Sequence, residues 1–486
     1  MAACRKTRNE TKADKKRRRT ARRAHSIEVS FSDENVTSFG GMVLEERLAS
    51  RLGLWKVLEK ALPEREGYSW IDVIRSGVAG LLTGSRGTFA AEELRKDQAL
   101  LDLLGLEAAP EEATLWRCLE GLGKMAQSGR LGLVEMEWVR RILAALSRRD
   151  LLECEGFFPV FLDGSLLEGS GRREGTKFIR EKGRGLVWGT IFTGPLVAAQ
   201  GLAAEGQGEE SLVRAMLPGV VKGVLEPLKL KDKALVLADS LYGDGPTLDA
   251  VEGEGLHYVV GANGLSEARR VLSEQPASQW CDEGPDKKRG WSQSALCVCW
   301  IMCEGWSHKR LLVGRRVLRE DELFETYWGV MTDFTQADLG AEDQRDFARK
   351  VWRLYDAKGR MELGYQELLT DLGLHHPPCQ EIVRNSGFYA LATLAHTLGM
   401  AVKLIGESAD HQRRRELAKE RNQGAPVAMH LKPKSRGMRL WRVMRRLFTL
   451  PARISFHARR LHVEFLGVSQ EIREQFERWF LRISRC

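Results

Sequence analysis

Short apolar runs and helical segments alternate in a fixed order through the middle of the chain, and this order limits the fold more than any other feature. Three consecutive runs lie between residues 158 and 206, and Gly or Pro separates them, as in strands joined by turns. A helical segment, an apolar run, a second helical segment and a last apolar run follow; they are 211–225, 234–239, 245–255 and 256–263. We therefore predict an α/β fold with a mixed sheet.

The segments on either side of this region have different patterns. Helical spacing of apolar residues predicts an all-α domain before it, which begins with a short strand at residues 26–31. A stretch rich in Trp, Cys and Val predicts an inserted β subdomain after it, and a long helix over residues 343–374 then resumes the core. The predicted division is 1–25, a disordered basic arm; 26–152, a helical DNA-binding domain; 153–263, the first part of the core; 264–333, the insertion; 334–407, the second part of the core; and 408–486, a basic helical C-terminal region.

The positive charge of the chain is confined to the basic arm. Eleven Lys and Arg but only two acidic residues lie between Arg5 and Arg23, which gives this segment the same net charge, +9, as the whole chain of 486 residues. The rest of the chain is therefore neutral. An arm of this kind is disordered alone and suits a polyanion. The alternative is a solvated tail without a partner.

The cysteines and the apolar segments indicate a cytoplasmic protein. Cys297, Cys299 and Cys303 form the single cluster among nine cysteines, and no Cys/His pair stands nearby at zinc-finger spacing, so neither a zinc site nor a disulfide framework is expected. The basic N-terminus lacks the apolar stretch of a signal peptide. The most apolar helix, residues 388–406, contains His396 and Lys403, which favours a buried core helix over a membrane span.

Three acidic residues have the settings that a divalent-metal site requires. Asp163 ends the apolar run 157–163, Asp239 ends the run 234–239, and Glu362 lies within the long helix. Carboxylate oxygens suit Mg²⁺, and two such ions clamp the attacking and leaving oxygens of a phosphoryl displacement. An Asp after a strand also caps turns, and Lys358 with Glu362 at i, i+4 is a common surface pair, so a structural role is the alternative for each residue.

Three ordered motifs resemble those of the DDE transposases of bacterial insertion sequences. FLDGS (161–165) is similar to their first-aspartate motif and LADSLYGDG (237–245) to their second. Tyr355, Lys358 and Glu362 follow their Tyr-x2-Arg-x3-Glu signature, and NSGFYALATLAHTL (385–398) resembles their closing core helix. The similarity extends from about residue 26 to residue 466. The resemblance implies a ribonuclease H-like mixed-sheet core, with which the predicted order of strands and helices agrees.

The resemblance also implies the activity and the roles of individual residues. The protein would use Mg²⁺, with Mn²⁺ as a substitute, to hydrolyse DNA at the ends of an element and to join the freed 3′-OH to target DNA. Asp163, Asp239 and Glu362 would be the catalytic metal ligands, and Tyr355 would lie near a DNA phosphate. Lys358 replaces the signature arginine and keeps the charge without the bidentate fork. Leu369 occupies the position of a later family lysine, a departure that concerns the hairpin step and not the metal site.

Further candidates for DNA contact lie outside the motifs. A basic loop follows the Asp163 strand and should touch DNA phosphates, unless it is a flexible charged hairpin. Three tryptophans of the insertion are candidates to stack on an extruded base, although most tryptophans are core residues. The loop residues are Arg172, Arg173, Lys177, Arg180, Lys182 and Arg184, and the tryptophans are Trp291, Trp300 and Trp306.

The predicted partner is double-stranded DNA, both the terminal inverted repeats of an element and the target, bound by a homodimer. The all-α region is the better candidate to read bases, because a helix fits the major groove. The basic helix 436–450 is the weaker one, since its apolar stripe looks like core packing. Two alternatives to an active transposase remain open: an inactive or domesticated DNA-binding derivative, which the missing cation at Leu369 favours, and a ribonuclease H-like nuclease without strand transfer.

Overall fold

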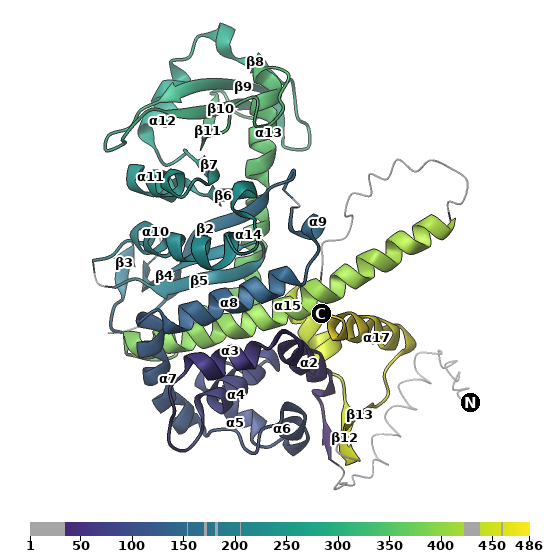
Figure 1. Cartoon of the computed structure of the whole chain (residues 1–486). Coiled ribbons are helices and arrows are strands. Elements are labelled where there is room, and N and C mark those ends of the chain that lie inside the picture. Colours follow the sequence, from purple (N-terminus) through teal and green to yellow (C-terminus); the bar gives the residue numbers. More distant parts are fainter. Residues whose placement is uncertain are drawn as a thin grey trace, which may run out of the picture.

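A computed structural model describes residues 35–152, 154–169, 173–179, 183–204, 206–421, 438–457 and 460–486 (Figure 1). The basic arm and the strand predicted at residues 26–31 lie outside these ranges, as do Arg172, Arg180 and Lys182.

A ten-stranded mixed sheet forms the centre of the fold and confirms the predicted class. Its order is β3-β4-β2-β6-β7-β11-β10-β9-β8, and β5 also pairs with β4. Strands β2, β4 and β5 are antiparallel neighbours, whereas β2, β6 and β7 are parallel. Helix α10 leads from β5 to β6, and α11 leads from β6 to β7. All five residues of β6 are buried, as expected for a parallel strand covered on both faces. These elements are β2 (Phe158–Glu168), β3 (Lys177–Ile179), β4 (Gly183–Thr193), β5 (Leu196–Leu202), α10 (Glu209–Val220), β6 (Ala234–Ala238), α11 (Gly245–Gly253) and β7 (His257–Gly261).

The inserted strands extend the same sheet. Strand β11 pairs antiparallel with β7, where Val330 lies opposite Gly261 and Thr332 opposite Val259. Strands β10, β9 and β8 then follow outward, and α12 packs on one face of them (Figure 1). The bounds are α12 (Ser266–Ser273), β8 (Cys281–Asp282), β9 (Trp291–Ile301), β10 (Arg310–Arg319) and β11 (Thr326–Thr332).

The long helix α15 (Ile382–Arg421) joins the sheet to the helical region that precedes it in sequence (Figure 1). Glycines let α7 and α15 approach closely: a Cβ on Gly123 would lie 1.7 Å from the Val383 oxygen, and a Cβ on Gly387 would lie 2.2 Å from the Leu119 oxygen. The most apolar 18-residue window of α15 is 94% buried inside the protein, as predicted for a core helix. The helices of this region are α2 (Val43–Leu52), α3 (Leu54–Ala61), α4 (Trp70–Leu82), α5 (Ala90–Leu94), α6 (Gln98–Leu104), α7 (Glu112–Gln127), α8 (Arg130–Ala144) and α9 (Arg148–Leu151), with short 3₁₀ turns at Gly40–Met42 and Gly87–Phe89.

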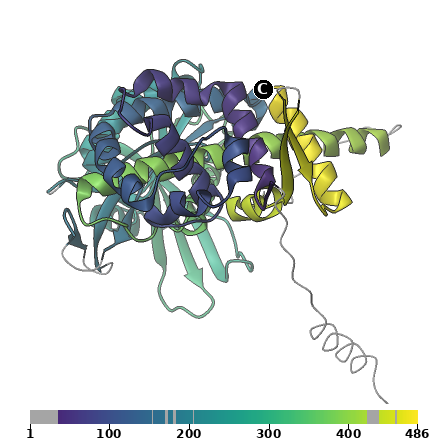
Figure 2. The same ribbon diagram turned by 90° about the horizontal axis from the view of Figure 1, so that it is seen from below.

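The C-terminal segment completes the core of the helical region (Figure 2). Strand β1 (Val36–Thr37) pairs with β12, which pairs with β13, and α17 packs on α15 and α2. The apolar stripe of the predicted basic helix is buried, as expected from its pattern; its residues are Leu440, Val443, Met444 and Leu447. A fragment that contains only the helical region, ending near residue 152, would therefore expose the surfaces that α15 and α17 cover. Tests of DNA binding by this region thus require the full chain. The bounds are α16 (Leu440–Val443), a π-helical turn (Met444–Phe448), β12 (Ala452–His457), β13 (Arg460–Phe465) and α17 (Gln470–Ser484).

The helix predicted as continuous over residues 343–374 is broken into three pieces. These are α13 (Gln344–Asp356), α14 (Gly359–Tyr365) and a π-helix (Gln366–Asp371). At the break the Lys358 N–H donates to the Tyr355 oxygen at 2.9 Å, a tighter turn than that of an α-helix. Gly359 follows, and glycine is a poor helix former. The prediction of one helix was wrong because the local turn at Lys358 outweighs the apolar periodicity on either side.

Glu135 is a buried acid that predicts how stability depends on pH. Burial raises its pKa from 4.5 to about 8, although the Gln200 amide donates to it at 3.3 Å. Between these two values the folded state keeps a proton that the unfolded state releases, so rising pH lowers the free energy of unfolding by up to about 1.4 kcal/mol per pH unit. We expect Glu135→Gln to flatten this decline. Urea unfolding at pH 5, 7 and 9 measures it, and parallel profiles for the two proteins would contradict the prediction.

Candidate active site

Asp163 and Asp239 occupy adjacent positions on neighbouring parallel strands. Leu162 of β2 lies opposite Ala238 of β6, so the next residue on each strand is an aspartate, and the strand spacing is about 4.8 Å. Asp239 ends β6 as predicted. Asp163 does not end its strand, because the antiparallel ladder with β4 continues β2 as far as Glu168. Asp239 also caps the following turn, since its Oδ1 accepts the Leu241 N–H at 2.9 Å.

The electrostatics of Asp163 show that negative charge gathers around it. The pKa of Asp163 is raised to about 7, mainly by burial and in part by the charges of Asp239 and Glu209, which together outweigh the lowering by the Gly164 N–H and Lys358. The hydrogen bond from the Gly164 N–H to Asp163 Oδ1 is 2.9 Å long. A divalent cation would relieve the repulsion among these carboxylates, and their hard oxygen atoms are the ligands that Mg²⁺ prefers.

Two residues of the third motif, Tyr355 and Lys358, lie beside the two aspartates. The Tyr355 hydroxyl fills the space above Gly261, where a Cβ would lie 2.6 Å from it and 3.5 Å from the Asp239 carbonyl carbon. Burial raises the pKa of Tyr355 to about 12, and the charges of Asp239 and then Glu362 add to the shift. Lys358 lies close enough to lower the pKa of Asp163. Glu362 is exposed in the first turn of α14.

Glu367, the nearest other carboxylate to Glu362 in the sequence motif, is excluded as a metal ligand. Its Oε1 accepts from Lys403 Nζ at 2.5 Å and from the Leu440 N–H at 3.0 Å, both in the core. Leu369, at the position of the family lysine, packs against the same core.

Four polar side chains near the aspartates were not predicted. The Tyr242 hydroxyl donates to Glu209 Oε1 at 2.5 Å, and the Tyr365 hydroxyl makes a short hydrogen bond with Thr190 Oγ1. The charges of Asp163, Glu209 and Asp239 contribute to raising the pKa of Tyr365 above its ordinary value, after burial as the main cause. No sequence signal identified Glu209, because the predicted helix began at residue 211 and Glu209 begins α10 in the structure.

The described part of the basic loop is held by the protein. Arg173 points inward, where its Nε is buried and its charge partly offsets the rise that burial causes in the pKa of Tyr389. Lys177 Nζ donates a short hydrogen bond to the Gln207 oxygen. Arg184 is exposed and donates to Thr176 Oγ1 at 3.2 Å. Arg184 is exposed, whereas the side chains of Arg173 and Lys177 are partly buried. Phosphate contact by these three residues stays a prediction.

Two of the three candidate tryptophans are buried. Trp291 is 6% exposed and packs at a tilt against Trp328, with Arg289 and Arg315 over its ring, so it cannot stack on a base in this conformation. Trp306 is 7% exposed and lies under Arg310. Trp300 is 63% exposed. It lies on β9, which β7, β11 and β10 separate from β6, a lateral distance of about 19 Å at the usual strand spacing.

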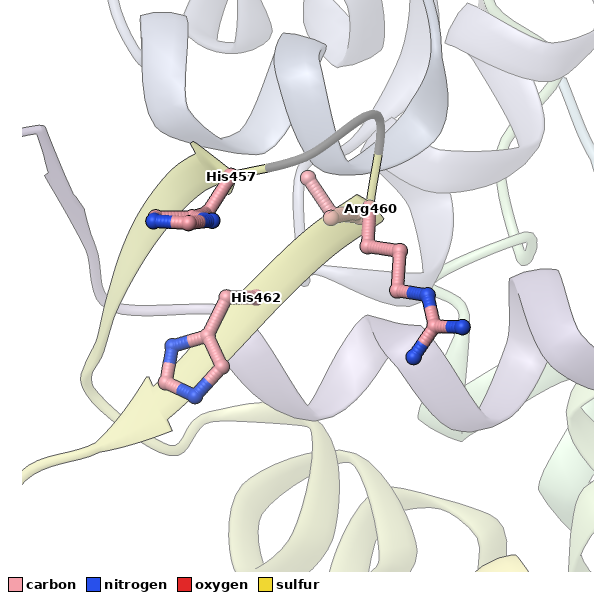
Figure 3. A pocket seen from close by; sticks show the side chains of 4 residues that line it. His457, Arg460 and His462 are labelled. Carbon is pink, nitrogen blue, oxygen red and sulfur yellow. The ribbon is translucent and has the colours of Figure 1, made fainter.

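Two other groups of polar side chains are weaker candidates for a metal site than Asp163 and Asp239. In the described part of the chain, one set of three acidic or histidine side chains has ligand atoms within 4.8 Å of one another, Asp249, Glu252 and His308. Arg310 already neutralises it, with Nε 2.9 Å from Glu252 Oε1. The hollow at the β12–β13 hairpin has a volume of about 510 Å³ and is lined by basic and apolar residues without a carboxylate (Figure 3). The residues that line it are His457, Arg460, Leu461 and His462.

Comparison with known proteins identifies the family to which the chain belongs. The family model for the transposase DDE domain, group 1, matches residues 19–440, a range that contains Asp163, Asp239 and Glu362. The chain belongs to this family and is therefore a DNA transposase by class. No curated protein matches the sequence. Among solved structures, a piggyBac transposase synaptic complex with hairpin DNA is similar at 10% identity, with a TM-score of 0.31, over 81% of this chain and 87% of that one.

Proposed function

We propose that this transposase belongs to an insertion sequence, cuts DNA at the ends of the element and joins them to target DNA by metal-dependent phosphoryl transfer. The observation that carries the proposal is the placement of Asp163 and Asp239 side by side on parallel strands, with Lys358 and Tyr355 beside them. Cytoplasmic DNA is the substrate, and a homodimer holds the two ends.

Asp163, Asp239 and Glu362 are the proposed ligands of Mg²⁺, for which Mn²⁺ would substitute. When bound, such ions stabilise the charge that develops on the attacking and leaving oxygens. Lys358 would contact the phosphate next to Asp163 and hold it as a point charge. The Tyr355 hydroxyl, packed on Gly261, would orient the same backbone.

A strand-transfer assay with the full chain tests the proposal. The protein is mixed with DNA that carries paired element ends, a target plasmid, and either Mg²⁺ or EDTA. Joined products that require Mg²⁺ are expected. Cleavage without joining would overturn the proposal in favour of a nuclease, and DNA binding without cleavage in favour of an inactive derivative.

Recognition of the element ends is assigned to the helical region, residues 36–152. The protein must find these ends among a large excess of non-specific DNA, so part of it must read bases. The catalytic core is not assigned this role, because its chemistry is the same on any DNA sequence. The basic loop is the proposed site of phosphate contact, and among its described residues Arg184 is exposed. The residues are Arg172, Arg173, Lys177, Arg180, Lys182 and Arg184. Competition of terminal-repeat against scrambled DNA for the full chain measures the selectivity. Equal competition by both DNAs would contradict base reading by this protein.

Deletion of residues 1–25 should weaken DNA binding at low salt and flatten its salt dependence. The arm contributes a net charge of +9, and each neutralised DNA phosphate adds about −0.9 to the slope of log affinity against log salt concentration. Fluorescence anisotropy across salt concentrations measures the slope. A variant with all eleven Lys and Arg between Arg5 and Arg23 changed to Gln serves as a control of equal length. An unchanged slope in both proteins would show that the arm does not bind DNA.

A further inference from the structure

Arg315 is an arginine of the inserted strands that packs against two tryptophan rings. It lies on β10, and its guanidinium carbon Cζ is 4.3 Å from the ring centre of Trp352 on α13 and 5.5 Å from that of Trp291 on β9. Both rings are buried, whereas Arg315 remains partly exposed. Stacking of this kind covers the face of the guanidinium plane, and the N–H donors point outward from its edge.

The Arg315 guanidinium has no hydrogen-bond acceptor or ion-pair partner among the residues that the structure describes. Three carboxylates lie near enough to act on its charge, but each of them forms an ion pair with another arginine. The pairs join Arg289 to Asp356 at 3.4 Å and to Asp286 at 3.7 Å, and Glu283 to Arg345 and Arg349 at 2.7 Å each. Four arginines therefore share three carboxylates, which leaves one positive charge in excess in this part of the described chain.

Burial makes this excess charge unfavourable. The pKa of Arg315 is lowered to about 10, mainly by burial and in part by the charge of Arg289, which outweigh the three carboxylates. Stacking on tryptophan offsets part of the penalty, yet it satisfies none of the N–H donors. A ligand with a negative charge and acceptor oxygens would supply what the described residues do not.

Trp352 also connects Arg315 to the proposed active site. Trp352 and Tyr355 are one helical turn apart on α13, and their rings meet edge to face with centres 5.9 Å apart. The Tyr355 hydroxyl in turn packs above Gly261, beside Asp239. Helix α13 packs on β7, β11, β10 and β9, so Arg315 lies on the sheet face that this helix covers, displaced from Asp239 toward the insertion (Figure 1). A DNA strand held at the aspartates and continuing toward the insertion would bring its phosphates to Arg315.

We propose that Arg315 binds a backbone phosphate of the DNA beside the position of cleavage, through two N–H groups of its guanidinium. This proposal rests on the proposed function, because it names a further contact to the same DNA. Arginine suits the role, since its planar fork matches two phosphate oxygens at once. Trp352 and Trp291 are positioning residues, which hold the guanidinium plane before DNA arrives and so reduce the freedom lost on binding.

Fluorescence anisotropy of the full chain with a labelled duplex that carries one element end, in EDTA and at several salt concentrations, tests the contact without using activity. Arg315→Gln should weaken binding about tenfold or more, the range for a lost charge-assisted hydrogen bond, and should reduce the salt slope by about 0.9 for one phosphate. Arg316→Gln is the matched control, because Arg316 points to the opposite face of β10, where it stacks on Trp280 and pairs with Glu325 at 3.4 Å. This control should bind DNA like the wild type. Unchanged affinity and slope in Arg315→Gln would overturn the proposal.

A scan of the duplex with single methylphosphonates separates a direct contact from an effect of packing. Each methylphosphonate replaces one charged phosphate by a neutral group. At one or two positions beside the cleavage site, the wild type and Arg316→Gln should lose affinity, whereas Arg315→Gln should lose no more than it has already lost. If every position that weakens the wild type weakens Arg315→Gln by the same factor, Arg315 acts through packing alone and the proposal is overturned.

Arg315→Met provides the same scan if Arg315→Gln does not fold. Methionine keeps an unbranched stem against the tryptophan rings and removes the charge. Near-UV circular dichroism and the melting temperature establish which variants fold. Wild-type sensitivity of Arg315→Met at every position would also overturn the proposal.

Cleavage by the wild type distinguishes failure of this proposal from failure of the proposed function. Cutting and joining by the wild type, with no phosphate position assigned to Arg315, would overturn the proposal and leave the proposed function standing. A phosphate position assigned to Arg315 in a wild-type protein that neither cuts nor joins DNA would overturn the proposed function and support the contact.

Discussion

Asp163→Asn is expected to abolish DNA strand cleavage while the protein still folds and binds DNA. The substitution keeps the shape of the side chain and removes the charge next to Asp239 that a divalent cation needs. Metal ions contribute several kcal/mol to phosphoryl transfer, which corresponds to a rate loss of about a thousandfold or more. Cleavage of end-labelled element DNA in Mg²⁺ measures the rate, and a gel shift in EDTA measures binding.

The matched control is Asp232→Asn, an exposed aspartate just before β6 that should cleave at the wild-type rate. Asp239→Asn and Glu362→Gln are expected to lose cleavage as Asp163→Asn does. Because burial and the like charges of Asp239 and Glu209 disfavour ionised Asp163, the free energy of unfolding in EDTA at pH 8 should not fall in Asp163→Asn. Cleavage retained in Mg²⁺, or loss of the folded state, would contradict the assignment of Asp163.

Lys403→Met is expected to lower the free energy of unfolding by about 3–5 kcal/mol, the cost of leaving one partner of a buried ion pair without the other. Lys403 on α15 and Glu367 of the π-helix have side chains 11% and 5% exposed, and Nζ lies 2.5 Å from Oε1. The pair ties α15 to the segment that follows the Glu362 helix. Urea unfolding monitored by tryptophan fluorescence measures the change.

Lys124→Met provides the comparison at the surface. Lys124 and Glu120 also form an ion pair, at 2.7 Å, but their side chains are 68% and 40% exposed. Exposed pairs contribute at most about 1 kcal/mol, so this variant should be nearly as stable as the wild type. An equal loss of unfolding free energy in the two variants would mean that burial does not determine how much the Lys403–Glu367 pair contributes to stability.

The order of the strands and the positions of the two aspartates were predictable because they depend on local pattern. A fully apolar run such as residues 234–238 is typical of a parallel strand covered on both faces. Asp239 directly follows this run and must then lie at the carboxyl end of the strand. With three strands before a helix and a strand, Asp163 and Asp239 are brought to adjacent strands by topology alone.

Other features depended on contacts between segments far apart in sequence. Trp291 and Trp306 are buried because arginines and neighbouring strands cover them, and no local pattern distinguishes them from the exposed Trp300. Arg173 lies inward because the loop packs against the start of α15, where the Ile382 N–H donates to Glu174 at 3.0 Å.

The sequence by itself determined the mixed α/β fold and the order of strands and helices along the chain, since hydrophobic period and chain connectivity specify them. Tertiary structure alone decided that Asp163 and Asp239 follow paired residues of neighbouring strands and that Glu209 lies against Gly164. Its approach requires the missing Cβ of Gly164 on β2 and the buried hydroxyl of Tyr242 after β6. Three residues from three separate segments meet there, and only the packing of α10 on the sheet brings them together.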